Sequence, residues 1–73
     1  MATATSGACV ENIGATAGKI WSALEENGPL SVTKLTQTVA EPRGLVMQGL
    51  GWLAREGKIN IEEEGRSRVV SLT

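Results

Sequence analysis

Hydrophobic residues in the segment 42–57 recur with the 3.6-residue period of an amphipathic helix. When successive residues are turned by 100°, the apolar side chains and one glycine fall within half of the helix surface. These inward positions are Leu45, Val46, Gly49, Leu50, Leu53 and Ala54. The opposite stripe holds Gly44, Gln48, Gly51 and Arg55, and it is bordered by Met47 and Trp52. The segment therefore predicts a helix with one face in a small core and the other in solvent.

A first helix is predicted at 12–27, where Asn12 can cap the start and a Gly-Pro pair stops the end. Its buried stripe is Ile13, Ala17, Ile20 and Leu24, with Trp21 at the edge. Gly14 and Gly18 lie on a neighbouring strip, and each costs roughly 1 kcal/mol of helix propensity relative to alanine. We therefore expect another element to approach these two glycines closely.

A short helix is predicted at 31–38, with Ser31 as its N-cap and Val32 and Leu35 facing inward. A turn then leads to Pro42, which suits the first position of the 42–57 helix because its missing N–H is not needed there. Gly57 is a suitable residue to end that helix. The chain thus predicts two helices joined by a tight turn.

After residue 57 the hydrophobic period changes from 3.6 to 2. Ile59 and Ile61 alternate with polar residues, and Val70 and Leu72 do so again further on. The charged segment 63–66 lies between them and contains a glycine. This pattern predicts two strands joined as a β-hairpin, which needs the helices to cover its apolar side.

The 73 residues of the chain are enough for one small domain with a single hydrophobic core. Residues 1–10 are small and polar and are predicted to form a disordered tail before a domain at 11–73. The chain has one Cys, so no internal disulfide can form, and no apolar run is long enough for a membrane span or a signal peptide. The expected compartment is the cytoplasm.

A family resemblance rests on two groups of residues. They are Ile13, Gly14, Ala17, Gly18, Ile20, Trp21 and Leu24 in the first helix, and the run Gly-Trp-Leu-Ala-Arg-Glu-Gly-Lys-Ile at 51–59. On these residues the chain resembles the winged helix-turn-helix superfamily, and more narrowly the small prokaryotic winged-helix proteins catalogued as a domain of unknown function. The resemblance implies a mainly α, α+β fold, in which three helices precede a two-stranded wing.

Catalytic and metal-binding patterns are missing from the chain. It has no His or Asp, and Cys9 lies in the predicted tail without a base. The cluster Glu62 to Glu64 is adjacent in sequence, so its side chains alternate between two faces of a strand and suit a solvated hairpin tip better than a metal site. We therefore expect no enzyme, no metal, no cofactor and no small-molecule substrate.

Double-stranded DNA is the first candidate partner that the resemblance implies. In helix-turn-helix proteins the second helix of the motif enters the major groove, where Gln reads adenine and Arg reads guanine. The base-reading positions would be Gln48 and Arg55. The phosphate contacts would be Thr33, Lys34, Arg43, Arg66 and Arg68. The electrostatics oppose this role, because the segment 31–57 carries a net charge of only +1 and the wing region 58–73 is neutral.

The alternative is a protein-interaction or homodimerisation module that uses the outer face of the 42–57 helix without DNA. Gly44 and Gly51 thin this face, so another backbone could come close. Met47 and Trp52 border it, and both residue types are enriched at interface cores. The sequence leaves both alternatives open, with DNA binding placed first because of the fold.

Overall fold

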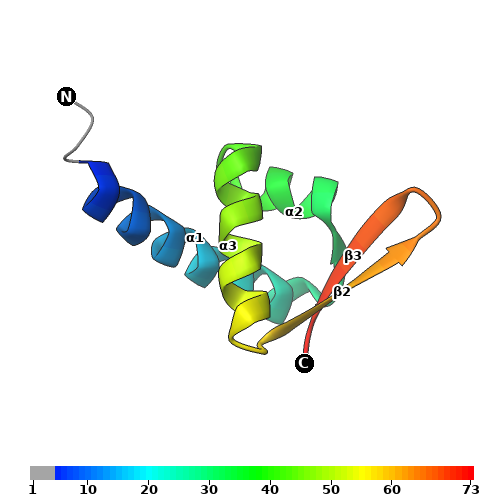
Figure 1. Ribbon diagram of the computed structural model, residues 1–73. Helices are drawn as coiled ribbons and strands as arrows, with labels where there is room; N and C mark the ends of the chain where they lie inside the picture. Colours follow the sequence, from blue (N-terminus) through cyan, green and yellow to red (C-terminus); the bar gives the residue numbers. More distant parts are fainter. Residues whose placement is uncertain (1–4) are drawn as a thin grey trace.

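The computed structural model describes residues 5–73, with their side chains from residue 10 onward. The elements are α1 (Thr5–Asn27), β1 (Leu30–Ser31), α2 (Val32–Val39), α3 (Arg43–Arg55), β2 (Ile59–Glu64) and β3 (Ser67–Leu72) (Figure 1). The hairpin of β2 and β3 extends away from the helices as a wing. The predicted order of three helices followed by a two-stranded hairpin is confirmed.

Helix α1 starts earlier than predicted, at Thr5 instead of residue 12. No proline interrupts this part of the chain, so the helix continues through Asn12, which is an exposed helical residue and not a cap. Residues 5–10 of the predicted tail are therefore helical, whereas residues 1–4 lie outside the described residues. Within residues 5–73 no helix, α1 included, has the length and apolar composition needed to cross a membrane.

Ser31 caps α2 as predicted, and its hydroxyl accepts a hydrogen bond from the backbone N–H of Lys34 at 3.1 Å. The helix then ends at Ala40, whose N–H donates to the carbonyl of Thr36 at 3.0 Å. Pro42 stands one position earlier than predicted, as the cap of α3, because its ψ of 144° is extended and not helical. The tight turn between these caps sets the two helices of the motif at an angle to one another (Figure 1).

The sheet has three strands in the order β1-β3-β2, and all neighbours are antiparallel. The third strand was not predicted, because the two residues of β1 are too few to show a period. Leu30 pairs with Val70 there. The hairpin turn is also tighter than the predicted segment 63–66. Glu64 pairs with Ser67 across a two-residue loop that begins with Gly65 at a φ of 61°.

The core lies where the three helices and the sheet meet. Its buried apolar residues include Ala17, Ile20, Ala23, Leu24, Val32, Leu35, Val39, Val46, Leu50, Leu53, Ile59 and Val70. The predicted inner face of α3 is confirmed at Val46, Gly49, Leu50 and Leu53. Ala54 is instead exposed, since it lies at the edge of the stripe near the end of the helix.

The prediction that Gly14 and Gly18 are closely approached is wrong for the described residues, where nothing lies within 4 Å of a Cβ built at either position. The close approach occurs at Gly49 instead. A Cβ there would be 2.9 Å from Ile20 Cδ1 and 3.3 Å from the backbone nitrogen of Ala17. Helices α1 and α3 therefore meet at Gly49, and Gly14 and Gly18 lie away from this contact.

Candidate functional site

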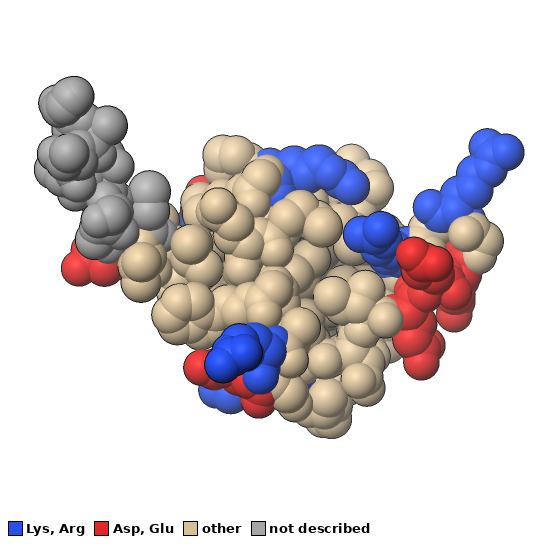
Figure 2. All heavy atoms as spheres, in the orientation of Figure 1, with Lys and Arg blue, Asp and Glu red and all other residues tan. Residues whose placement is uncertain are grey.

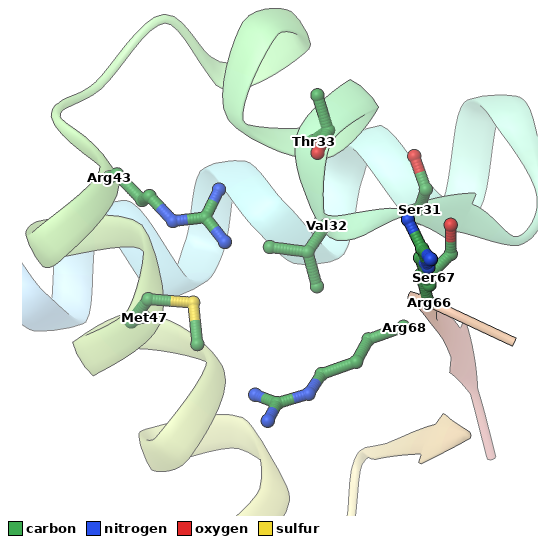
Figure 3. Close-up of a pocket in the computed structure, with 8 residues that line it drawn as sticks. All are labelled: Ser31, Val32, Thr33, Arg43, Met47, Arg66, Ser67 and Arg68. Atoms are coloured by element: carbon green, nitrogen blue, oxygen red, sulfur yellow. The ribbon is translucent and has the colours of Figure 1, made fainter. Parts of the chain in front are cut away.

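A cleft of about 330 Å³ opens between the start of α2, the start of α3 and the wing (Figure 3). We call it the arginine cleft. It is lined by Ser31, Val32, Thr33, Arg43, Met47, Arg66, Ser67 and Arg68. Three of these residues are arginines, three are hydroxyl residues, and none is acidic. This composition suits an anionic ligand.

Helical and strand periods bring the arginines together. Arg43 is the first residue of α3, and Met47 lies one turn later on the same side of that helix. Arg68 stands two residues before the buried Val70 on β3, so its side chain leaves the sheet toward the helices. Figure 3 shows Arg43 and Arg68 reaching into the cleft from opposite sides, with Val32 between them. The cleft thus joins the helix-turn-helix to the wing.

The wing's three glutamates are divided by the strand alternation. Glu63 is directly opposite Arg68 in the register and shares its face, with Arg68 Nε 3.6 Å from Glu63 Oε2. Glu62 and Glu64 point to the other face. The Glu63–Arg68 pair is solvent-exposed, so it restrains Arg68 only weakly. Figure 2 shows basic groups along the upper side of the wing and acidic groups below them.

The predicted DNA contacts fall into two groups. Thr33, Arg43, Arg66 and Arg68 all line the cleft. Lys34, Gln48 and Arg55 are exposed and do not line it. Ser31, Val32 and Ser67 belong to the cleft and were not proposed as contacts. Ser31 could have been predicted as a site residue from its role as the N-cap of α2, because the N-cap of this helix lies close to Thr33.

The predicted interface residues of α3 do not form a single patch either. Met47 lines the arginine cleft, whereas Gly51 and Trp52 line a hollow of about 400 Å³ at the other end of the helix, together with Arg55 and Glu56. Gly44 is exposed, and nothing lies within 4 Å of a Cβ built there. The outer face of α3 is therefore open along its length.

A second hollow, the tryptophan groove, lies between α1 and α3 and has a volume of about 410 Å³. Gly14 and Gly18 line it from α1 together with Trp21, and Trp52 lines it from α3. Trp21 is 37% exposed and Trp52 is 41% exposed. The groove is where the outward glycines of α1 leave room beside two aromatic side chains. The helical period places Trp21 beside these glycines, but no local pattern connects Trp21 to Trp52.

Side chains of the types that ligate metal ions are scattered over residues 10–73. Among the described residues, no group of three His, Cys, Asp or Glu side chains could hold a metal ion. No buried side-chain nitrogen or oxygen among them lacks a hydrogen-bond partner. The polar groups that these residues offer to a ligand are exposed side chains, both charged and neutral.

The fold agrees with a comparison against known families, in which the model described as "Winged helix-turn-helix domain (DUF2582)" matches residues 9–72. The chain belongs to this family. The resemblance noted from the sequence is thereby confirmed, for the superfamily and for the narrower group. The match covers the region from the first turns of α1 to the end of the wing.

Individual relatives extend across archaea and bacteria. The chain is 36% identical over 62 residues to the uncharacterized protein MJ1608 of Methanocaldococcus jannaschii. This match covers 82% of this chain and 89% of MJ1608. The solution NMR structure of BT2368 from Bacteroides thetaiotaomicron is similar with a TM-score of 0.77 and 34% identity, covering 85% of this chain and 76% of that one. Reduced HlyU from Vibrio cholerae is similar with a TM-score of 0.73 and 25% identity, covering 92% and 72%.

Proposed function

We propose that this winged helix-turn-helix protein binds double-stranded DNA and acts as a transcriptional regulator. In this role α3 lies in the major groove and the arginine cleft holds the adjacent phosphate backbone. Winged helix domains commonly bind DNA in this way. The observation that carries the proposal is the convergence of Arg43, Arg66 and Arg68 on one cleft beside the recognition helix.

The chemistry of the cleft supports phosphate binding. A guanidinium group presents several N–H donors in a fixed plane, and it pairs with phosphate oxygens through two hydrogen bonds at once. Thr33 and the two serines add hydroxyl donors. Because Glu62 and Glu64 point to the other face of the wing, the cleft can meet the backbone while these two carboxylates face away.

Base reading falls to the outer face of α3. Gln48 and Arg55 are seven residues apart, which places them two turns from one another on the same side and about 10 Å apart along the helix axis. Gly51 lies between them, and no atom of a neighbouring residue lies within 4 Å of a Cβ built at Gly51. The helix can therefore approach the groove floor closely, with Gln48 suited to adenine and Arg55 to guanine.

A salt titration on mixed-sequence duplex DNA tests the phosphate contacts. Three arginines on three phosphates give a slope of log affinity against log salt of about −2.7. Arg43→Gln and Arg68→Gln should each reduce the magnitude of this slope by about 0.9. The matched control is Lys58→Gln, which removes one cation that pairs with Glu56 outside the cleft. No binding at low salt, or an equal loss in the control, would remove the cleft from DNA binding.

The base contacts need a separate test on sites selected from a random duplex library. Arg55→Ala should weaken the selected site by about 1–3 kcal/mol relative to mixed DNA, the worth of one bidentate base contact. The salt slope should stay nearly unchanged if Arg55 reads a base. Equal weakening on selected and mixed DNA would show that Arg55 contacts a phosphate, and unchanged affinity for both would show that Arg55 does not contact the DNA.

Protein binding through the tryptophan groove is the second candidate, with another protein or a second copy as partner. The exposure of Trp21 and Trp52 in one groove favours it, since tryptophans in such positions dominate binding energy at interfaces. Trp52→Ala should then reduce the mass of the assembly measured by light scattering while circular dichroism shows a folded chain. An unchanged mass would show that the tryptophan groove does not bind the partner. Unfolding of the variant would show that Trp52 stabilises the core.

A further inference from the structure

The longer free edge of the sheet runs along β2, because β1 at the opposite edge has only two residues. The strand order β1-β3-β2 leaves the outer side of β2 unpaired within residues 5–73. The carbonyl of Lys58 accepts a hydrogen bond from the N–H of Thr73 at 3.2 Å. Because antiparallel pairs alternate, Asn60 and Glu62 also bond to β3, and Ile59, Ile61 and Glu63 direct their backbone N–H and C=O groups to the outer edge.

Ile61 makes this edge unusual. It stands opposite the fully buried Val70 and so shares the face of the sheet that covers the core. Ile61 is nevertheless 42% exposed, because it stands on the outer strand of the sheet whereas Val70 stands on the central one. A β-branched apolar side chain therefore lies uncovered beside unpaired backbone groups, which is the arrangement that a further strand would complete.

We propose that the β2 edge pairs with the β2 edge of a second copy, antiparallel and centred on Ile61. In this register each Ile61 lies against the other, and Lys58 of each copy lies opposite Glu64 of the second. Asn60 lies opposite Glu62 of the second copy. Cross-strand pairs of opposite charge and of β-branched residues stabilise a sheet. About six backbone hydrogen bonds join the two strands, and the two wings form one continuous sheet.

Neighbouring registers are less favourable. Shifting by two residues toward the turn places Glu62 opposite its own copy, and like charges directly opposite one another destabilise a pair. Shifting the other way places Ile59 opposite Ile61 and Lys58 opposite Glu62, but Glu63 and Glu64 then extend past the start of the partner's strand, so fewer backbone hydrogen bonds form. Only the register centred on Ile61 pairs the segment 58–64 with itself over its full length, which is why a second copy fits the edge. The three adjacent glutamates, which gave no metal site, then help to set the register.

The pairing is independent of the proposed DNA binding. The arginine cleft lies on the side of β3 that faces β1, α2 and α3, away from the β2 edge. The interface is short, below the roughly 1,200 Å² of stable complexes, so dimers form only at high concentration. Sedimentation of the full chain from about 10 µM to about 1 mM covers this range.

Charge reversal tests the register. Glu64→Lys places Lys58 opposite a lysine and should weaken self-association by about tenfold, and Lys58→Glu should do the same by placing two glutamates together. The double variant with both changes restores the opposite charges and should associate like the wild type. A mixture of the two single variants should form heterodimers, since each then presents the charge that the other needs.

Amide hydrogen exchange gives a second measurement on the same samples. The amides of Ile61 and Glu63 should become protected as concentration rises, whereas the amide of Glu62 should show no concentration dependence, since it already bonds to β3. A wild-type chain that stays monomeric at about 1 mM would overturn the proposal. So would association that survives Glu64→Lys and is lost in Trp52→Ala, because it would assign the contact to the tryptophan groove.

Discussion

The two faces of α3 use glycine for opposite purposes. On the inner face, Gly49 is buried and lies so close to α1 that a Cβ would be 2.9 Å from Ile20 Cδ1. On the outer face, Gly44 and Gly51 are exposed and have nothing within 4 Å. Both kinds of position lower helix propensity, but only the inner one gains a close helix contact in return. The comparison separates the residues that stabilise the fold from those available to a partner.

The contrast also explains why surface substitutions can be read as functional tests. The inner face contributes Val46, Leu50 and Leu53 to the one hydrophobic core of a very small domain. The outer face offers Gln48 and Arg55 to solvent. Changes to the first group should alter the free energy of unfolding, and changes to the second should alter binding while leaving stability nearly constant.

The largest expected effect follows removal of a core side chain from the inner face. Leu50 is 1% exposed, so Leu50→Ala leaves a cavity that the surrounding helices only partly fill. We expect the free energy of unfolding to fall by about 2–5 kcal/mol in urea denaturation. A loss below about 1 kcal/mol would mean that the inner face is loosely packed.

A smaller loss is expected where the two helices meet. Gly49→Ala inserts a methyl group against the fully buried Ile20 and against the backbone of α1. The overpacking cost exceeds the propensity gain of alanine, so we expect a net destabilisation of about 1–2 kcal/mol. A stabilised Gly49→Ala chain would show that α1 can move away without cost.

The matched substitution on the outer face should have the opposite sign. Gly51→Ala adds a methyl group in open space within a helix, so we expect the free energy of unfolding to rise by about 0.5–1 kcal/mol. The same denaturation measurement serves for both glycines. If Gly51→Ala destabilised the chain as much as Gly49→Ala, the outer face would have to be packed in solution.

The smallest effect on stability belongs to the outer polar side chain. Gln48→Ala should change the free energy of unfolding by less than about 0.5 kcal/mol, because Gln48 is exposed. Binding to a selected DNA site should nevertheless weaken if Gln48 reads a base. Thermal denaturation alongside the binding assay checks both parts, and a large loss of stability would place Gln48 among the fold-determining residues.

Much of the fold followed from local patterns. The 3.6-residue period of 42–57 identified the buried residues of α3, and Ser31 and Gly57 marked helix ends. The change to a period of 2 located the wing. These signals were sufficient because each depends on residues within one or two turns of each other. The start of α1 was misplaced because Asn12 is a good cap that the chain does not use.

The candidate site was predicted only in part. Four cleft residues were named as DNA contacts, but nothing in the sequence indicated that Arg43 and Arg68, 25 positions apart, line one cleft. Met47 was assigned to a protein interface because its place on the helix says nothing about the wing beside it. The strand β1 was not predicted, because two residues show no period of their own. They form a strand only through their pairing with β3, in which Leu30 lies opposite Val70.

The sequence by itself determined the three helices, the hairpin, their order and most of the inward face of α3, because hydrophobic period and capping act over a few residues. Only the tertiary structure decided which glycine lies at the helix crossing, where Trp21 and Trp52 share a groove, and which side of the wing carries Arg68 toward α3. Those features depend on how α1, α3 and the sheet pack together. That packing depends on contacts between residues far apart in the chain, which a local pattern does not contain.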